Sequence, residues 1–314
     1  MKKKWIVIVS VAFVFITGSW AAPISAEDSE DQQSRNFTFG GPGAVEIQIM
    51  NDGEIDLPLF FKSYNAWKVD LAKKTGFSFE IDYTAVWLGA DSSLGDDEAA
   101  GGIVRIFGSW NLTGRGNPNN GALVWKVEHR HAFTDVAPSN FASPLGYIGS
   151  IDPTFSDNGA RLTNLYWRQK LNGGRTVIIG GWLDAGDYVD VYSMADTWTT
   201  FRNQAFSTGT TTMAVPAESF GFAGSMMQKS VSAGFGYQWD RSKDFLGVGL
   251  NWGEPNEETW GPGLDDQFTV ELFYRWQISK AFAITPDLQY FKNPAMNPEA
   301  DSIWVFGLRI RGVL

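Results

Sequence analysis

Strict alternation of apolar and polar residues runs through the C-terminal third of the chain. In residues 267–278 every even position is apolar, and every odd position except Phe273 is polar. Two further runs, 282–290 and 304–310, follow the same pattern. A period of two residues is that of a β-strand, whose successive side chains point to opposite faces of a sheet. These segments are therefore predicted to be strands of about ten residues.

The same alternation recurs upstream and gives about eleven predicted strands in all. The eight additional runs lie near 77–84, 104–112, 123–127, 161–171, 174–184, 218–227, 230–239 and 243–252. Two long segments, 27–76 and 185–217, do not alternate, and the second is rich in Ser, Thr and Ala. Within the first, residues 66–75 are expected to form a short helix that Gly76 ends. The fold class predicted from this pattern is all-β and antiparallel.

The composition of the two strand faces indicates their surroundings. The apolar face is unusually aromatic, and its aromatic residues gather near strand ends: Trp87, Trp110, Tyr274, Trp276, Tyr290 and Trp304. The polar face carries charges of both signs in mid-strand. A soluble β-sandwich would fill its core with Val, Leu and Ile and turn such charges to water. A transmembrane barrel instead places aromatic girdles at two membrane interfaces and charges in a wet lumen. The barrel is favoured over the sandwich.

The first 26 residues have the features of a secretory signal peptide. Lys2, Lys3 and Lys4 precede an apolar run over 5–16, and small residues allow cleavage after Ala21 or Ala26. The run is shorter than the ~20 residues that a membrane-spanning helix needs. An exported chain is therefore expected. Its predicted domains are the signal peptide (1–26), an N-terminal periplasmic or plug-like segment with the short helix (27–76), and the barrel (77–314). Within the barrel, 185–217 is a long loop that could fold into the lumen.

Composition excludes several functional classes. The chain has no Cys, which excludes disulfides, thiol nucleophiles and Cys-ligated metals. Its formal net charge of -10 argues against nucleic acid as a partner, because phosphate binding needs clustered Lys and Arg. No cofactor, metal site or catalytic residue is predicted.

Several motifs in order along the chain resemble the carbohydrate-selective porins of the OprB type. The similarity covers nearly all of the mature chain, and the stretches that carry it are 35–42, 76–79, 82–85, 121–131 (GALVWKVEHRH), 162–169 (LTNLYWRQ), 183–191 (LDAGDYVDV), 244–253, 271–275, 284–290 and 305–309. The resemblance implies an outer-membrane barrel for passive diffusion of mono- and oligosaccharides or other small solutes. It also implies outer-membrane lipids and the barrel-assembly machinery as partners, and a homotrimer as a candidate assembly.

The chain departs from that family in length. Family members usually have sixteen strands, and this chain is shorter, with the difference falling near residues 224–232. Apolar residues occupy even positions at Phe220 and Phe222 but odd positions from Val231 onward. Since a one-residue slip exchanges the two faces, residues 226–230 must hold a turn or a bulge. We infer an internal deletion of roughly five strands there. Barrels of this class have even strand counts, so ten strands are expected, or twelve if residues 45–50 add one.

The polar face supplies the candidate solute-contacting residues. For sugar passage a lumen needs hydrogen-bonding groups that replace water and aromatic faces for the sugar ring. The candidates are Lys126, Glu128, Arg130, Tyr166, Arg168, Glu271, Arg275, Asp287, Arg309 and Arg311. For any one of them the alternative is that opposed charges simply pair or hydrate inside the barrel. As a set, charges of both signs suit a neutral solute better than a charged one.

Other interpretations stay open. A shortened barrel could be closed and non-conducting. A small outer-membrane barrel hydrolase is a further alternative, with His129 and His131 as its histidines, but their phase places them on the apolar face. Asp184, Asp187 and Asp190 lie close together in sequence, yet they lack the pattern of a calcium loop, so a solvated turn is preferred.

Overall fold

Ten strands form one continuous antiparallel sheet. The computed structural model describes residues 59–184, 197–207, 209–210, 225–239, 243–279 and 281–314. The strands are β1 (Phe77–Ala90), β2 (Glu98–Thr113), β3 (Gly121–Ala132), β4 (Gly159–Leu171), β5 (Thr176–Trp182), β6 (Met227–Gln238), β7 (Phe245–Pro255), β8 (Gln267–Ser279), β9 (Phe282–Lys292) and β10 (Ser302–Val313). Their order is β5-β4-β3-β2-β1-β10-β9-β8-β7-β6, so β1 pairs with β10. The all-β antiparallel prediction is confirmed.

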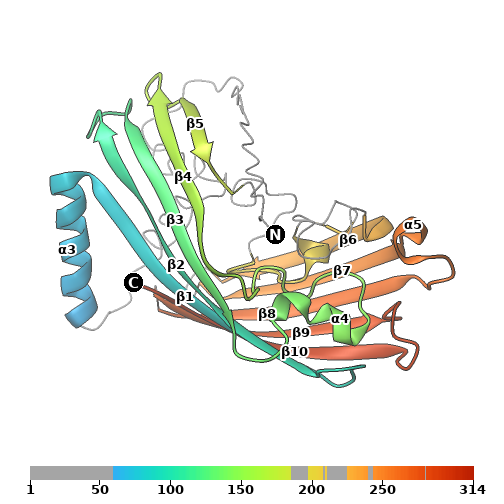
Figure 1. The fold of residues 1–314 in the computed structure, drawn as a ribbon. Coiled ribbons are helices and arrows are strands. Elements are labelled where there is room, and N and C mark those ends of the chain that lie inside the picture. Colours follow the sequence, from blue (N-terminus) through green and yellow to red (C-terminus); the bar gives the residue numbers. More distant parts are fainter. Residues whose placement is uncertain (1–58, 185–196, 208, 211–224, 240–242, 280) are drawn as a thin grey trace, which may run out of the picture.

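The sheet is curved but not closed (Figure 1). Its two edge strands, β5 and β6, have no mutual pairing among the described residues. Ten of the eleven predicted runs correspond to strands. The remaining run, 218–227, lies mostly outside the described residues, as do residues 45–50 and the predicted signal peptide.

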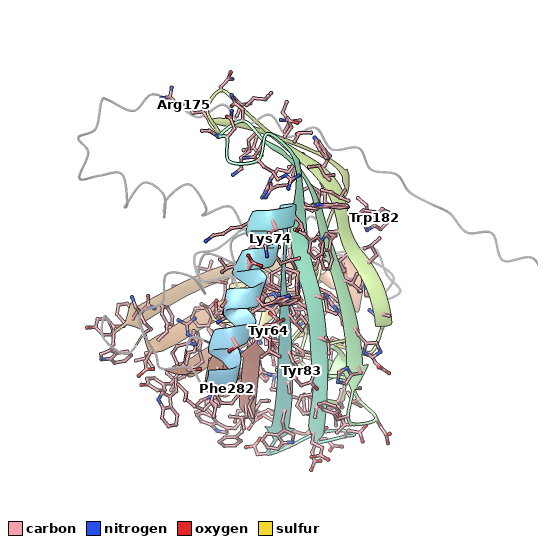
Figure 2. The ribbon with its side chains drawn as sticks, turned by 90° about the vertical axis from the view of Figure 1, so that its left-hand side faces the viewer. Tyr64, Lys74, Tyr83, Arg175, Trp182 and Phe282 are labelled. Carbon is pink, nitrogen blue, oxygen red and sulfur yellow. The ribbon has the colours of Figure 1, made fainter. Side chains whose placement is uncertain are left out.

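The N-terminal helix α3 (Leu59–Thr75) is longer than the segment predicted from sequence. It ends where expected, because Gly76 adopts a φ of 75° that residues with a side chain rarely take. Lys68 Nζ lies 2.6 Å from Glu80 Oε2, and the rings of Trp67 and Phe79 meet edge to face. These contacts hold the helix alongside the start of β1 (Figure 2). No helix of the described chain is long and apolar enough to cross a membrane.

The remaining helical segments of the described residues are short and lie in the connections. They are η2 (Pro138–Asn140), α4 (Ala142–Leu145), η4 (Gln204–Phe206) and α5 (Glu257–Trp260). The sheet curves around the segments 133–158 and 197–207, which include the first three of these helices. We call the face that these segments contact the inner face.

The two faces of the sheet have the polarity predicted from the alternation. Large apolar side chains point outward and are exposed, including Phe235 at 62% and Trp276 at 54%. On the inner face, Asp82, Arg105 and Glu271 are buried, with an exposed fraction of 3% or less. This distribution is the reverse of that in a water-soluble domain, where charges face solvent and large apolar residues are buried. It is the distribution of a barrel whose outer surface contacts lipid.

A β-bulge lies near the start of β6. The pairing of β6 with β7 shifts near the start of β6. Met227 pairs with Pro255 and Lys229 pairs with Glu254, so two residues along β6 correspond to one residue along β7. A bulge places an extra residue in one strand and so exchanges the faces of the residues that follow. The predicted turn or bulge within 226–230 is therefore a bulge. From this point the odd residues of β6, such as Val231 and Phe235, face outward.

The connections differ in length at the two ends of the sheet. One end has the short connections 114–120, 172–175, 239–244 and 280–281, and the other has 91–97, 133–158, 183–226, 256–266 and 293–301. Outer-membrane barrels have short periplasmic turns and longer extracellular loops. Because β5 ends and β6 begins at the long-loop end, any strands missing between them must be even in number.

Cysteine labelling will test this orientation, since the chain has no native Cys. Pro118 and Asp265 are both exposed, at the short-turn and long-loop ends respectively. In intact cells, a membrane-impermeant maleimide is expected to label Asp265→Cys but not Pro118→Cys. After the outer membrane is permeabilised, both variants should be labelled. The reverse pattern in intact cells would contradict the orientation.

Candidate functional site: the charged inner face

The structure places all ten predicted solute-contacting residues on the inner face. Seven are buried, namely Lys126, Glu128, Tyr166, Glu271, Arg275, Asp287 and Arg309, and three are partly buried, namely Arg130, Arg168 and Arg311. They come from β3, β4, β8, β9 and β10, which lie in the two halves of the sheet. The residues therefore share one surface, and seven of the ten belong to one of two clusters.

The first cluster is centred on two buried carboxylates of β1 and β3. Arg105 donates from Nε to Oδ1 of Asp82 at 2.8 Å and from Nη2 to Oδ2, and Arg311 Nη2 donates to the same Oδ2 at 3.1 Å. On β3, Glu128 accepts from Arg130 Nε at 2.9 Å and Nη2 at 2.7 Å. Lys126 Nζ lies 3.3 Å from the other Glu128 oxygen. Cations thus outnumber anions on this half of the inner face.

The second cluster joins the segment 197–207 to β8, β9 and β10. Glu271 accepts the backbone N–H groups of Arg202 at 2.7 Å and Asn203 at 3.0 Å. Arg309 donates from Nη1 to the carbonyl of Thr197 at 2.5 Å and from Nη2 to that of Thr200 at 3.1 Å. Glu271 and Arg309, both predicted lumen residues, therefore hydrogen-bond to main-chain groups of the segment 197–207. This geometry fixes where the loop lies against the wall.

Arg202 is a fully buried cation of this second cluster. Its Nε donates to Asp152 Oδ2 at 2.7 Å, and its Nη1 lies 3.9 Å from Asp287 Oδ1. A charge removed from water is tolerated only when opposite charges and hydrogen bonds compensate it. Asp152 comes from the loop 133–158, so Arg202 ties two loops to the sheet. Burial raises the pKa of the Asp152 carboxyl although Arg202 lies beside it.

A chain of hydrogen bonds between amide and hydroxyl groups runs from the same loop to the Asp287 carboxylate. Asn203 Nδ2 donates to Gln289 Oε1 at 3.0 Å, and Gln289 Nε2 donates to Asp287 Oδ1 at 3.0 Å. Tyr147 donates its hydroxyl hydrogen to Asn203 Oδ1 at 3.1 Å, and its oxygen lies 3.0 Å from Thr269 Oγ1. Burial raises the pKa of Tyr147 to about 12, so this phenol stays protonated and can donate.

Sequence analysis missed the loop residues of this network, among them Tyr147, Asp152, Arg202 and Asn203. They lie outside the alternating runs, so periodicity could not assign them to a face. The available signal was Arg202, the one cationic side chain of the 185–217 segment, which is rich in Ser, Thr and Ala. Asp82 and Arg105 belong to the alternating polar face, but they were not among the candidate site residues.

Aromatic groups from the loops also lie over the inner face. The guanidinium carbon of Arg105 is 3.4 Å from the ring centroid of Trp198, a cation–π contact. Phe201 and Phe206 pack with Phe273 in a buried cluster. The described part of the 185–217 loop therefore lies against the inner face and covers part of it.

The two histidines lie on the outer face, as their phase predicted. His131 Nε2 is 3.1 Å from the Tyr83 hydroxyl, and the Nδ1 atoms of His129 and His131 are 3.3 Å apart. Among the described residues these are their hydrogen-bond partners. The described chain holds no cluster of three potential metal ligands. Of the three acidic residues considered for calcium, Asp187 and Asp190 lie outside it.

Comparisons with known proteins agree with this architecture. Residues 223–314 match the model of the carbohydrate-selective porin, OprB family. The resemblance to OprB-type porins is confirmed for the C-terminal third of the chain. The high-pH structure of Pseudomonas putida OprB has a TM-score of 0.62 at 13% identity and covers 80% of this chain and 97% of that chain. This likeness shows a shared fold.

Two further solved structures are less similar. The low-pH structure of Pseudomonas putida OprB gives a TM-score of 0.44 at 12% identity, covering 80% of this chain and 97% of that one. OmpT of Vibrio cholerae gives 0.39 at 11% identity, covering 76% and 99%. No curated protein matches the sequence.

Removing the buried cation tests the network. The substitution Arg202→Met removes the guanidinium charge that lies beside the carboxylates of Asp152 and Asp287. Removing one partner of a buried ion pair lowers the free energy of unfolding by about 3–5 kcal/mol. We expect the denaturant midpoint of the detergent-solubilised protein to fall accordingly. Lys229→Met is the matched control, because it breaks an exposed ion pair with Glu254 and should leave the midpoint nearly unchanged. Equal midpoints for the two variants would contradict the network's role.

Proposed function

We propose that this chain is an outer-membrane porin for the passive diffusion of sugars and other small hydrophilic solutes. The observation that carries the proposal is the reversed polarity of the sheet, with aromatic residues outside and charges of both signs inside. The match of residues 223–314 to the carbohydrate-selective porin family supports the same conclusion. The bacterial outer membrane, reached with a cleaved signal and the barrel-assembly machinery, is the proposed location.

Selectivity would come from the inner-face groups that hydrogen-bond a passing solute. Sugars are neutral and carry many hydroxyl groups, so they need donors and acceptors that replace hydration water. The guanidinium groups of Arg168, Arg275 and Arg311 can donate, Asp287 can accept, and Tyr166 offers a ring face. Because Glu271 and Arg309 hold the 197–207 segment, their proposed role is to position that segment beside the path rather than to bind the solute directly.

Planar-bilayer recording tests the proposal. Purified protein that shows heat-modifiable migration should give discrete single-channel steps. Titration with sugars of increasing size should reduce the current, because a sugar inside the lumen obstructs ions. A folded preparation that gives no steps would overturn the conducting porin.

A closed or non-conducting relative is the second candidate, and one observation favours it. The segments 133–158 and 197–207 bury Phe141, Leu145, Phe155, Phe201 and Phe206 inside the curvature of the sheet. Side chains already fill the interior of an eight-stranded barrel, so a small barrel has little space beside such loops. The loops would then act as a plug.

A loop replacement separates the two candidates. Residues 198–206 are replaced by a short Gly-Ser linker, together with Asp152→Asn to remove the Arg202 partner on the neighbouring loop. In an open porin we expect this variant to conduct more per channel than the unmodified protein. In a plugged relative the unmodified protein is silent and the variant conducts. A conductance unchanged by the replacement would show that the segment does not restrict the path.

The hydrolase alternative is tested by the histidines. The double variant His129→Ala and His131→Ala is expected to retain the conductance of the unmodified protein, because both rings lie on the outer face away from the inner-face network. An esterase or peptidase activity that disappears in this variant would support the hydrolase.

A further inference from the structure

Tyr83, His129 and His131 form a polar cluster on the outer face of β1 and β3. The two histidines are two residues apart on β3, so their rings lie on the same side of the sheet. Their Nδ1 atoms are 3.3 Å apart, and His131 Nε2 lies 3.1 Å from the Tyr83 hydroxyl. The arrangement brings together two imidazole nitrogens and a phenol on an exposed face.

The separation of the two Nδ1 atoms matches that of a pair of zinc ligands. Zinc in proteins is tetrahedral and lies about 2.0–2.1 Å from each histidine nitrogen, so two such nitrogens are about 3.3–3.4 Å apart. In a square-planar copper complex, bonds of that length put neighbouring nitrogens about 2.9 Å apart. The observed 3.3 Å therefore favours a tetrahedral ion. The alternative is a hydrogen bond in which one Nδ1 donates to the other.

Tyr83 and Phe133 hold the ring of His131 in place. A histidine that binds a metal through one nitrogen generally donates a hydrogen bond from the other. With zinc on Nδ1, His131 carries its hydrogen on Nε2 and donates it to the Tyr83 oxygen. The Tyr83 ring also stacks on His131, with centroids 5.9 Å apart and planes 12° apart, and Phe133 meets the same ring edge to face. The ring orientation of His131 is thus fixed by groups that do not bind the ion.

Gly102 of β2 makes room for the contact between Tyr83 and His131. It pairs with His131 in the sheet. A Cβ atom at this position would lie 2.7 Å from His131 Nε2 and would collide with the Tyr83 hydroxyl. Any larger residue would therefore push the two rings apart, and the hydrogen bond between them depends on this glycine.

The cluster lies near the membrane interface at the long-loop end. Trp87 pairs with Ala100, and the Phe133 N–H donates to the Ala100 carbonyl at 2.8 Å, so Trp87 and Phe133 belong to one row of the outer face. His131 precedes Phe133 by two residues, about 7 Å along the strand. Aromatic rows of this kind mark the interface with water. His129 is exposed, so water can reach the two Nδ1 atoms and supply further ligands.

We propose that His129 and His131 bind a zinc ion through their Nδ1 atoms, and that Tyr83 is the residue that positions His131. Two waters complete the tetrahedron. In structural zinc sites the protein supplies all four ligands, so this ion is an exchangeable one. The site lies on the outer face, apart from the charged inner face, and the proposal does not depend on solute passage.

Zinc titration by isothermal calorimetry tests the site in detergent-solubilised protein purified without a histidine tag. The chain has two histidines and no cysteine, so few strong zinc ligands compete with the site. We expect one zinc ion per chain, with two imidazole ligands in the X-ray absorption spectrum. His129→Gln and His131→Gln should each abolish saturable binding at the zinc concentrations that saturate the unmodified protein.

Two variants test the positioning role without changing a ligand. Tyr83→Phe removes the acceptor of the His131 hydrogen bond, and Gly102→Ala pushes the two rings apart. Each is expected to weaken zinc binding by roughly tenfold or more, as loss of a group that orients a metal ligand does. Tyr237→Phe is the matched control, because Tyr237 is an exposed outer-face tyrosine of β6 and should leave the affinity unchanged. Heat-modifiable migration checks that every variant is folded.

Several results would overturn the proposal. If the unmodified protein shows no saturable binding, the two Nδ1 atoms share only a hydrogen bond. Binding that survives in the His129→Gln/His131→Gln double variant, or a spectrum with one imidazole ligand, would place the ion elsewhere. Equal affinity in the urea-unfolded chain would assign binding to the local sequence rather than to the fold. Unchanged affinity in both Tyr83→Phe and Gly102→Ala would remove the positioning role. None of these measurements uses conductance, so their outcome is separate from that of the porin proposal.

Discussion

Buried charge on the inner face of the sheet is the constraint on which the rest of the structure depends. A carboxylate or guanidinium group removed from bulk water must be compensated by opposite charge and hydrogen bonds. Asp82 meets this requirement between two arginines of neighbouring strands, and Glu271 meets it with the main chain of the segment 197–207. The charges that predict a wet lumen in the sequence thus also determine where the loops pack.

The buried charges of the two halves of the inner face are compensated in different ways. Beside β1 to β3, compensation comes from side chains of the same strand, as for Glu128, or of adjacent strands, as for Asp82, so the ion pairs lie along the wall. Beside β8 to β10, it comes from two loops joined through Arg202 and Asp152. The loop-covered half is where the conducting and plugged interpretations differ, because the same contacts that order the loops also narrow the space between the strands.

Backbone hydrogen bonding links the fold to its assembly. The neighbouring β1 and β10 come from opposite ends of the described strand series, so that junction is sealed within the chain. The opposite side of the sheet is left with two edges. Unpaired strand edges favour aggregation in water, and in lipid each unpaired backbone group costs several kcal/mol, so the described sheet is complete as a membrane barrel only when both edges are paired.

The alternation in the sequence by itself determined the strand class, nearly all strand positions, and the face on which the mid-strand charged residues lie. It also located the change of phase before β6, because a one-residue slip in a period of two is visible without a structure. Helix α3 was found with a correct end at Gly76 but too short at its start. Only the tertiary structure decided that Tyr147, Asp152 and Arg202 meet at the inner wall and that β5 and β6 remain unpaired with each other. Both depend on contacts between segments far apart in the chain, which no local period can encode.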